Sequence, residues 1–243
     1  MPSLWVAVRA TLLYMAVVGL GMLYMYRVAD APYGTVAMVS RFWPVELILT
    51  CLCVYYVRRY YGCSGAGFGT MRWRGAFWLL PSYVVLAMMG AGVVPLLLHG
   101  TLSDADWHML RLLTVTTFLI GFSEEVMFRG ILLRGLIARL PVTHAMLISA
   151  VAFSLLHAVN GFDGQSVTNI AQQLAFTFLV GTFLAPAALK IGNLWPLIVW
   201  HWLWDLAVFS SDMLGVLHPF ALIGILIQAV VGLWLWADLL RQS

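Results

Sequence analysis

The sequence predicts an all-α integral membrane protein, a polytopic bundle of about eight transmembrane helices. Of its 243 residues, 63% are hydrophobic and only 9% are charged, whereas soluble domains carry about 25% charged residues. Apolar stretches recur along the whole chain, each about 17 to 25 residues long, which is the length that a helix needs to cross the hydrocarbon core. Little sequence remains between them, so we expect residues 1–243 to form a single membrane domain.

Eight apolar windows mark the expected helices. They lie near 4–26, 42–61, 76–98, 108–137, 143–159, 167–189, 194–211 and 217–237. The first is too long for a signal peptide, lacks a small-residue cleavage site and contains Arg9, so we expect a retained span. The Gly-rich, basic connection at 61–75 is expected to be a flexible connector, with contact to anionic lipids as the alternative.

The basic residues predict the orientation of the bundle. With eight spans both termini share one side, and nine Arg or Lys residues fall on that side against three on the other. The positive-inside rule therefore predicts that both termini are cytoplasmic, in a membrane that we expect to be a prokaryotic plasma membrane. We therefore interpret the net charge of +3 as an orientation signal, and nothing indicates nucleic acid as a partner. The nine are Arg9, Arg58, Arg59, Arg72, Arg74, Arg134, Arg139, Lys190 and Arg241.

Six ionisable residues stand out in three of the apolar windows. The stretch GFSEEVMFRG contains Glu124, Glu125 and Arg129, although a charge at the membrane centre costs roughly 2.5 to 3.5 kcal/mol on insertion scales. His157 ends FSLLH in the fifth window, and HWLWD in the seventh begins with His201 and ends with Asp205. Isolated polar residues in such helices usually make packing hydrogen bonds. We expect that role for Glu46, Asn169, Gln172 and Gln173.

The spacing within each cluster predicts local geometry. Glu125 and Arg129 are four residues apart, so on a helix they face each other and can form an ion pair. Glu124 lies about 100° around the same helix and can point elsewhere. His201 and Asp205 are also four residues apart. At about 1.5 Å per residue, Glu124, His157, His201 and Asp205 fall in one layer, roughly 9 to 18 Å from the cytoplasmic face.

A free carboxylate, two imidazoles and a further carboxylate in one layer suit hydrolysis. One group takes a proton from water, another orients that water, and donors stabilise the oxyanion. Ser123 lies beside Glu124, but no G-x-S-x-G turn and no H-E-x-x-H helix is present. Glu124, His157 and His201 can alternatively be read as three zinc ligands with an open fourth position.

Three motifs together resemble a known family. EEVMFR, FSLLH and HWLWD occur in the order of the E-E-x-x-x-R, F-x-x-x-H and H-x-x-x-N/D motifs of the CPBP intramembrane proteases, within about 107–211. That family includes type II CAAX prenyl endopeptidases and Abi relatives linked to bacteriocin processing and self-immunity. The resemblance implies an intramembrane endopeptidase that acts on lipidated or membrane-associated peptides.

The resemblance also implies roles for individual residues. Glu124 and His157 would activate the water, and His201 and Asp205 would line the oxyanion site. Glu125 and Arg129 would fix the geometry, with Phe153 of the second motif as further support. The prenyl endopeptidases have Asn where this chain has Asp205; an ionised Asp cannot donate to an oxyanion, so we expect Asp205 to orient His201. A metal-free mechanism is favoured, with zinc as the alternative.

Two other functions remain open at this stage, a non-catalytic membrane immunity protein and a proton-coupled transporter. Transporters are expected to show paired broken helices or inverted repeats, and the sequence shows neither. For a protease, we expect a water-filled cavity that opens toward the cytoplasm. Its apolar funnel would come from Phe153 and the tryptophans Trp200, Trp202 and Trp204.

Overall fold

The computed structural model describes residues 3–100, 102–163, 165–216 and 220–241, and these are almost entirely helical. The predicted all-α polytopic bundle is confirmed. In the described ranges the helices form eight rods, one for each apolar window; the predicted start of the last window, 217, lies outside those ranges. The rods are α1 (Leu4–Arg27); α2 (Val36–Tyr56) with η1 (Val57–Tyr61) and α3 (Gly62–Gly65); α4 (Trp73–Ala76), η2 (Phe77–Leu79) and α5 (Leu80–His99); α6 (Asp104–Glu125), η3 (Val126–Leu132) and α7 (Leu133–Ile137); α8 (Val142–Leu156) with η4 (His157–Asp163); α9 (Val167–Ile191); α10 (Trp195–Leu214); and α11 (Phe220–Leu240).

Among the described residues, six of these rods are long and apolar enough to cross a membrane. The other two are the rod from α6 to α7 and the helix α10. These two carry Glu124, Glu125, Arg129, His201 and Asp205, and such side chains lower the hydropathy of a helix. The two least apolar rods are therefore those that hold most of the candidate site.

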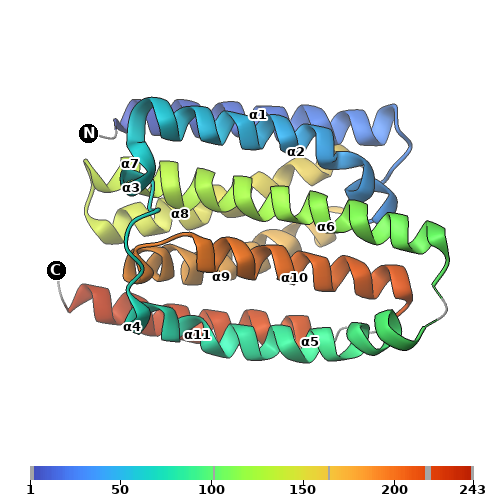
Figure 1. Cartoon of the computed structure of the whole chain (residues 1–243). Helices are drawn as coiled ribbons and strands as arrows, with labels where there is room; N and C mark the ends of the chain where they lie inside the picture. The colour runs from blue at the N-terminus through green and yellow to red at the C-terminus, as the bar shows by residue number, and fades with distance from the viewer. Residues whose placement is uncertain (1–2, 101, 164, 217–219, 242–243) are drawn as a thin grey trace.

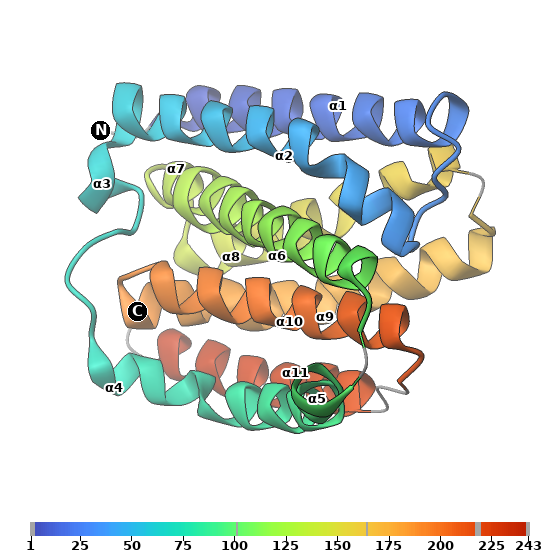
Figure 2. The ribbon, with the colours of Figure 1, turned by 45° about the vertical axis from the view of Figure 1, so that its right-hand side comes forward.

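The rods run side by side, and the first and last helices flank the others (Figure 1). Helices α1 and α2 lie along one side of the bundle, α5 and α11 lie along the opposite side, and α6, α8, α9 and α10 lie between them (Figure 2). Helix α6 packs against both α2 and α10. The start of α1 and the end of α11 are at the same end of the bundle, here called the terminal end (Figure 1).

Helices α6 and α10 approach each other closely because a glycine lies between them. A Cβ atom at Gly121 would lie 2.8 Å from the backbone nitrogen of Trp202 and 3.3 Å from the carbonyl oxygen of Ile198. Any larger residue must push the two backbones apart. Small residues commonly allow this kind of contact in membrane bundles, where packing rather than water drives helix association.

Helix α6 begins before its predicted window, at a capped polar turn. The hydroxyl of Ser103 accepts a hydrogen bond from the backbone N–H of Asp106, and the Asp106 carboxylate accepts one from the backbone N–H of Ser103. This capping box satisfies two of the N–H groups that lack partners at a helix start. Hydropathy alone does not detect such a turn, because its residues are polar.

The connection at 61–75 differs from the flexible connector that the sequence predicts. It contains the short helix α3, and its backbone is tied to the turn between α9 and α10. The N–H of Arg72 donates to the carbonyl of Ile191 at 2.8 Å, and the N–H of Leu194 donates to that of Gly67 at 2.9 Å. The sequence did not predict this order because the hydrogen-bond partners lie more than 100 residues away.

Candidate active site

A buried ion pair joins two of the predicted support residues. The Arg129 guanidinium donates to Glu125 Oε1 at 3.0 Å, and both side chains are fully buried. The i, i+4 pairing expected from the sequence is therefore present. Arg129 lies in η3, where the α-helix widens to a π-helix. Such segments are rare and often occur at functional sites.

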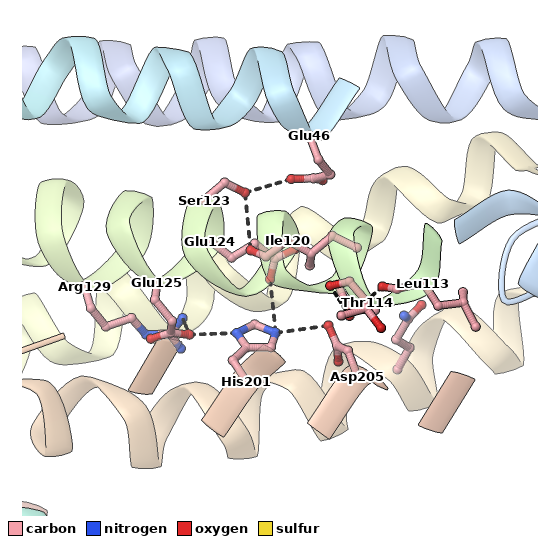
Figure 3. A network of polar contacts seen from close by, with 12 residues as sticks. Glu46, Leu113, Thr114, Ile120, Ser123, Glu124, Glu125, Arg129, His201 and Asp205 are labelled. Atoms are coloured by element: carbon pink, nitrogen blue, oxygen red, sulfur yellow. Dashed lines mark hydrogen bonds and ion pairs between the residues drawn. The ribbon is translucent and has the colours of Figure 1, made fainter. Parts of the chain in front are cut away.

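The same carboxylate also holds a histidine from another helix. His201 Nδ1 lies 3.0 Å from Glu125 Oε1, with hydrogen-bonding geometry (Figure 3). A carboxylate can only accept, so Nδ1 carries the proton. Glu125 thus connects Arg129 on its own rod to His201 on α10, and fixes the imidazole by one of its two nitrogens.

Two further carboxylates lie near the other imidazole nitrogen. His201 Nε2 is 3.8 Å from Glu124 Oε2 and 3.6 Å from Asp205 Oδ2 (Figure 3). These distances are longer than hydrogen bonds, and Glu124 Oε2 has no hydrogen-bond partner among the described residues. The region between Nε2 and the two carboxylates is therefore suited to an additional polar group such as water.

Phe153 packs at the centre of the charged groups. Its ring lies under the Arg129 guanidinium, whose carbon is 4.0 Å from the ring centroid, which is favourable cation–π geometry. The same ring makes edge contacts with the imidazoles of His157 and His201, with centroid distances of 5.3 and 6.2 Å. The predicted support residue thus contacts three of the charged or titratable side chains.

His157 comes from the point where α8 tightens into the 3-10 helix η4. Its Nδ1 lies 3.0 Å from the carbonyl oxygen of Phe153. Because a carbonyl oxygen only accepts, Nδ1 must donate, and a neutral imidazole then has its lone pair on Nε2. His157 is therefore held in the tautomer whose free nitrogen can accept a proton.

One cavity of about 150 Å³ brings the four predicted catalytic residues together. Glu124, His157, His201 and Asp205 all line it, from three different rods. A space of this size can hold several water molecules, since each needs about 30 Å³. The apolar part of the lining consists of Val18, Met22, Met38, Val39, Phe42, Ile120, Leu156, Val159 and Phe209.

One expectation about this cavity is wrong. The cavity is not lined by Phe153, Trp200, Trp202 or Trp204, which pack between helices. For example, the indole N–H of Trp202 donates to the carbonyl of Thr114 at 3.0 Å. The lining runs from the layer of His201 to Tyr33, between α1 and α2, at the end opposite the terminal end. The cavity therefore opens toward the cytoplasm only if that end, and not the terminal end, is cytoplasmic.

Sequence reasoning missed two polar residues of the cavity and gave a third only a packing role. Glu46, Tyr33 and Asn160 line it together with the predicted set. Glu46 was expected to make a packing hydrogen bond, and it does accept one from Ser123 Oγ at 2.8 Å. Asn160 donates to Gln173 Oε1 at 3.0 Å, and Gln173 in turn donates to Tyr33. Asn160 could have been found from its position in the sequence, one helical turn after His157.

The zinc alternative names Glu124, His157 and His201 as ligands. Within the described ranges, no group of three or more His, Cys, Asp or Glu side chains is arranged so that it could hold a metal ion. His201 donates from Nδ1 to Glu125, which leaves Nε2 as its ligand atom, the usual arrangement of a metal-binding histidine. Zinc therefore stays an alternative prediction for these three residues.

Comparison with known protein families gives one match. Residues 106–207 match the family described as Type II CAAX prenyl endopeptidase Rce1-like. The matched segment contains all three sequence motifs, and for residues 106–207 the match agrees with the family that they indicated. No curated protein and no solved structure matches the chain.

Proposed function

We propose that this integral membrane protein is an endopeptidase with its active centre inside the bundle. The premise is that residues 106–207 belong to the Rce1-like type II CAAX prenyl endopeptidase family. One observation carries the proposal. Glu124, His157, His201 and Asp205 line a single cavity of about 150 Å³ although they come from three rods. Hydrolysis of a peptide bond requires polar groups of these kinds around a space that can hold water.

In the proposed reaction, Glu124 acts as the general base. Its side chain lines the cavity, and its Oε2 has no hydrogen-bond partner among the described residues, so a water molecule is the partner that we propose for the carboxylate. The lone pair on His157 Nε2 accepts a second hydrogen from the same water and orients it. The water oxygen then attacks the carbonyl carbon of the substrate as Glu124 takes the proton.

His201 is the proposed oxyanion donor. It can donate from Nε2 only as the imidazolium, because Nδ1 already donates to Glu125. Three carboxylates, at 3.0, 3.6 and 3.8 Å from its two nitrogens, favour that charged form. Asp205 supports the imidazole from the Nε2 side, and Glu125 with Arg129 supports it from the Nδ1 side. The reaction needs no metal ion.

The proposed substrate is a lipidated or membrane-associated peptide. The lining beyond the polar groups is apolar, from Val18 on α1 to Phe209 on α10. An extended peptide that carries a lipid or a hydrophobic segment can leave water for such a surface. The family match supports prenylated C-terminal peptides as the first class to examine.

The test is peptide cleavage by the purified protein in detergent. The substrates are a mixed set of prenylated and unmodified membrane peptides, and the samples are wild type, Glu124→Gln and wild type treated with a chelator. We expect cleavage that survives the chelator and falls by about 100-fold or more in Glu124→Gln, because a positioned acid–base group typically contributes that much or more. Loss on chelation would instead establish a metal enzyme.

The control variant is Asp212→Asn at the far end of α10, which removes a carboxylate that does not line the cavity. It should cleave like the wild type. Equal cleavage by wild type and Glu124→Gln would overturn the assignment. Proton flux driven by a substrate in liposomes would support the transporter alternative, and a biological effect that persists in Glu124→Gln would support the non-catalytic one.

A further inference from the structure

A second glutamate faces the cavity from a helix outside the matched segment. Glu46 belongs to α2 and is 3% exposed. It lines the same cavity as Glu124 and approaches α6 from the side opposite His201 (Figure 3). The mechanism above does not use it. A carboxyl group inside a membrane bundle is costly unless it has a partner or a function.

The surroundings of the two glutamates differ in charge. Glu124 Oε2 lies 3.8 Å from an imidazole nitrogen of His201. Glu46 instead contacts a hydroxyl group, that of Ser123, and across the described ranges no cationic side chain forms an ion pair with it. Burial without a cation favours the neutral acid, because an unpaired buried carboxylate loses its hydration without compensation.

A chain of hydrogen bonds determines which oxygen of Glu46 can carry the proton. Ser123 Oγ donates to Glu46 Oε2 at 2.8 Å, and Tyr14 Oη lies 2.7 Å from the same Ser123 oxygen. When Ser123 gives its one hydrogen to Glu46, Tyr14 donates to Ser123. In that arrangement Oε2 accepts, and Oε1 carries the proton of the neutral acid.

We infer that Glu46 is the proton donor to the leaving nitrogen, so that the cavity contains a separate acid and base. Two carboxyl groups in one site, one paired with a cation and one held neutral, form the usual arrangement for a base and an acid in a single reaction. The inference rests on the proposed endopeptidase function, and it adds a catalytic residue from the first hundred residues of the chain.

The proton inventory of the reaction balances with these two groups. Water loses a proton to Glu124, and its oxygen bonds to the carbonyl carbon. The carbon–nitrogen bond then breaks, its electron pair goes to nitrogen, and nitrogen takes the proton from Glu46. Transfer of the proton on Glu124 to the Glu46 carboxylate, through water in the cavity, restores both groups. The products are one carboxylic acid and one amine.

The experiment compares two substrates that differ only in the leaving atom. The probe is a farnesylated, internally quenched peptide with an amide at the cleaved position, and its twin has an ester there. An alkoxide leaves without prior protonation far more readily than an amide anion. For Glu46→Gln we expect kcat on the amide to fall by about 100-fold or more and kcat on the ester to fall by less than about fivefold.

The ratio of the two rates makes the test independent of folding. A variant that is partly misfolded loses both activities equally, so the amide-to-ester ratio is unchanged. Glu46→Gln keeps an oxygen that accepts from Ser123, and Glu46→Asp keeps a carboxyl group. We expect the ratio to fall in Glu46→Gln and to recover largely in Glu46→Asp.

The outcomes separate this inference from the proposed function. An equal loss on amide and ester, or no loss, in Glu46→Gln would overturn the role of Glu46 while Glu124→Gln remained inactive. Two outcomes would overturn the endopeptidase activity on prenylated peptides and this inference with it. In one, Glu124→Gln cleaves both probes at wild-type rates. In the other, the wild type cleaves neither probe.

Discussion

At the scale of single residues, Arg129 is a fully buried cation whose charge is balanced by Glu125 at 3.0 Å. The variant Arg129→Met removes this cation and leaves the buried Glu125 with His201 as its only remaining ion-pair partner among the described residues. We expect a loss of about 3–5 kcal/mol in the free energy of unfolding, the usual cost of breaking a buried pair from one side. Denaturant unfolding of the purified protein in detergent measures it.

The double variant Glu125→Gln, Arg129→Met is the control for this prediction. It contains no unpaired charge, and Gln and Met are close in size to the residues they replace. It should therefore be more stable than Arg129→Met alone, because buried pairs are often replaceable by neutral groups at little cost. If the double variant loses as much stability as the single variants Arg129→Met and Glu125→Gln lose together, the ion pair does not contribute as a unit.

Asp205 is the position where this chain departs from the Asn of the prenyl endopeptidases. Its Oδ2 is 3.6 Å from His201 Nε2, whereas Glu125 holds Nδ1 at 3.0 Å. Since an amide N–H at this position can donate to the oxyanion, Asp205→Asn should retain kcat within about tenfold, while Asp205→Ala, which removes the polar group, should lose about 100-fold. Equal losses in the two variants would mean that the negative charge of Asp205 is required.

Contacts within one helix were predictable, and contacts between helices were not. The pair Glu125 and Arg129 follows from a spacing of four residues, as does the pair His201 and Asp205. The contact between Glu125 and His201 joins positions 76 residues apart, and no periodicity in the sequence gives it. Glu46 was expected only to pack, because nothing in a single helix shows that α2 lies against α6.

At the scale of helices, the close contact of α6 with α10 at Gly121 sets the distance between Glu125 and His201. A Cβ at position 121 would lie 2.8 Å from the backbone nitrogen of Trp202, so Gly121→Ala must separate the two helices. We expect a destabilisation of about 1–3 kcal/mol. We also expect kcat to fall more than tenfold, because a displacement of about 1 Å at a catalytic group can cost about 100-fold.

Gly90 on α5 provides the matched control, because no atom lies within 4 Å of a Cβ built there. Gly90→Ala should leave cleavage unchanged and should stabilise the helix slightly, since alanine has the higher helix propensity. Unfolding midpoints and peptide cleavage of both variants give the comparison. If Gly121→Ala behaves like Gly90→Ala, the spacing of the two helices does not control the site.

The positions of the helices were more predictable than their ends. Eight windows of hydropathy correspond to the eight rods, because each rod must match the thickness of the bilayer. The start of α6 at Asp104 depends instead on the cap at Ser103, and the order in the connection at 61–75 depends on hydrogen bonds to the turn after α9. Hydropathy detects neither of these features.

For the whole molecule, composition was enough to predict a membrane bundle, but not the direction of its cavity. The basic residues predict that the terminal end faces the cytoplasm. A C-terminal green fluorescent protein should then fluoresce in a bacterial host, and a C-terminal alkaline phosphatase should be inactive. The opposite pattern would mean that the terminal end faces the outer side of the membrane. The same fusions after residue 100, between α5 and α6, should give the reverse result.

The orientation decides from which side a substrate enters. The cavity runs from His201 toward Tyr33, away from the terminal end. If the termini are cytoplasmic, we expect a peptide that cannot cross the membrane to reach Glu124 from the outer side. Right-side-out vesicles should therefore cleave an added impermeant peptide, and inverted vesicles should do so only after detergent opens them. Faster cleavage by intact inverted vesicles, with the fusions as predicted, would mean that substrates enter from the terminal end.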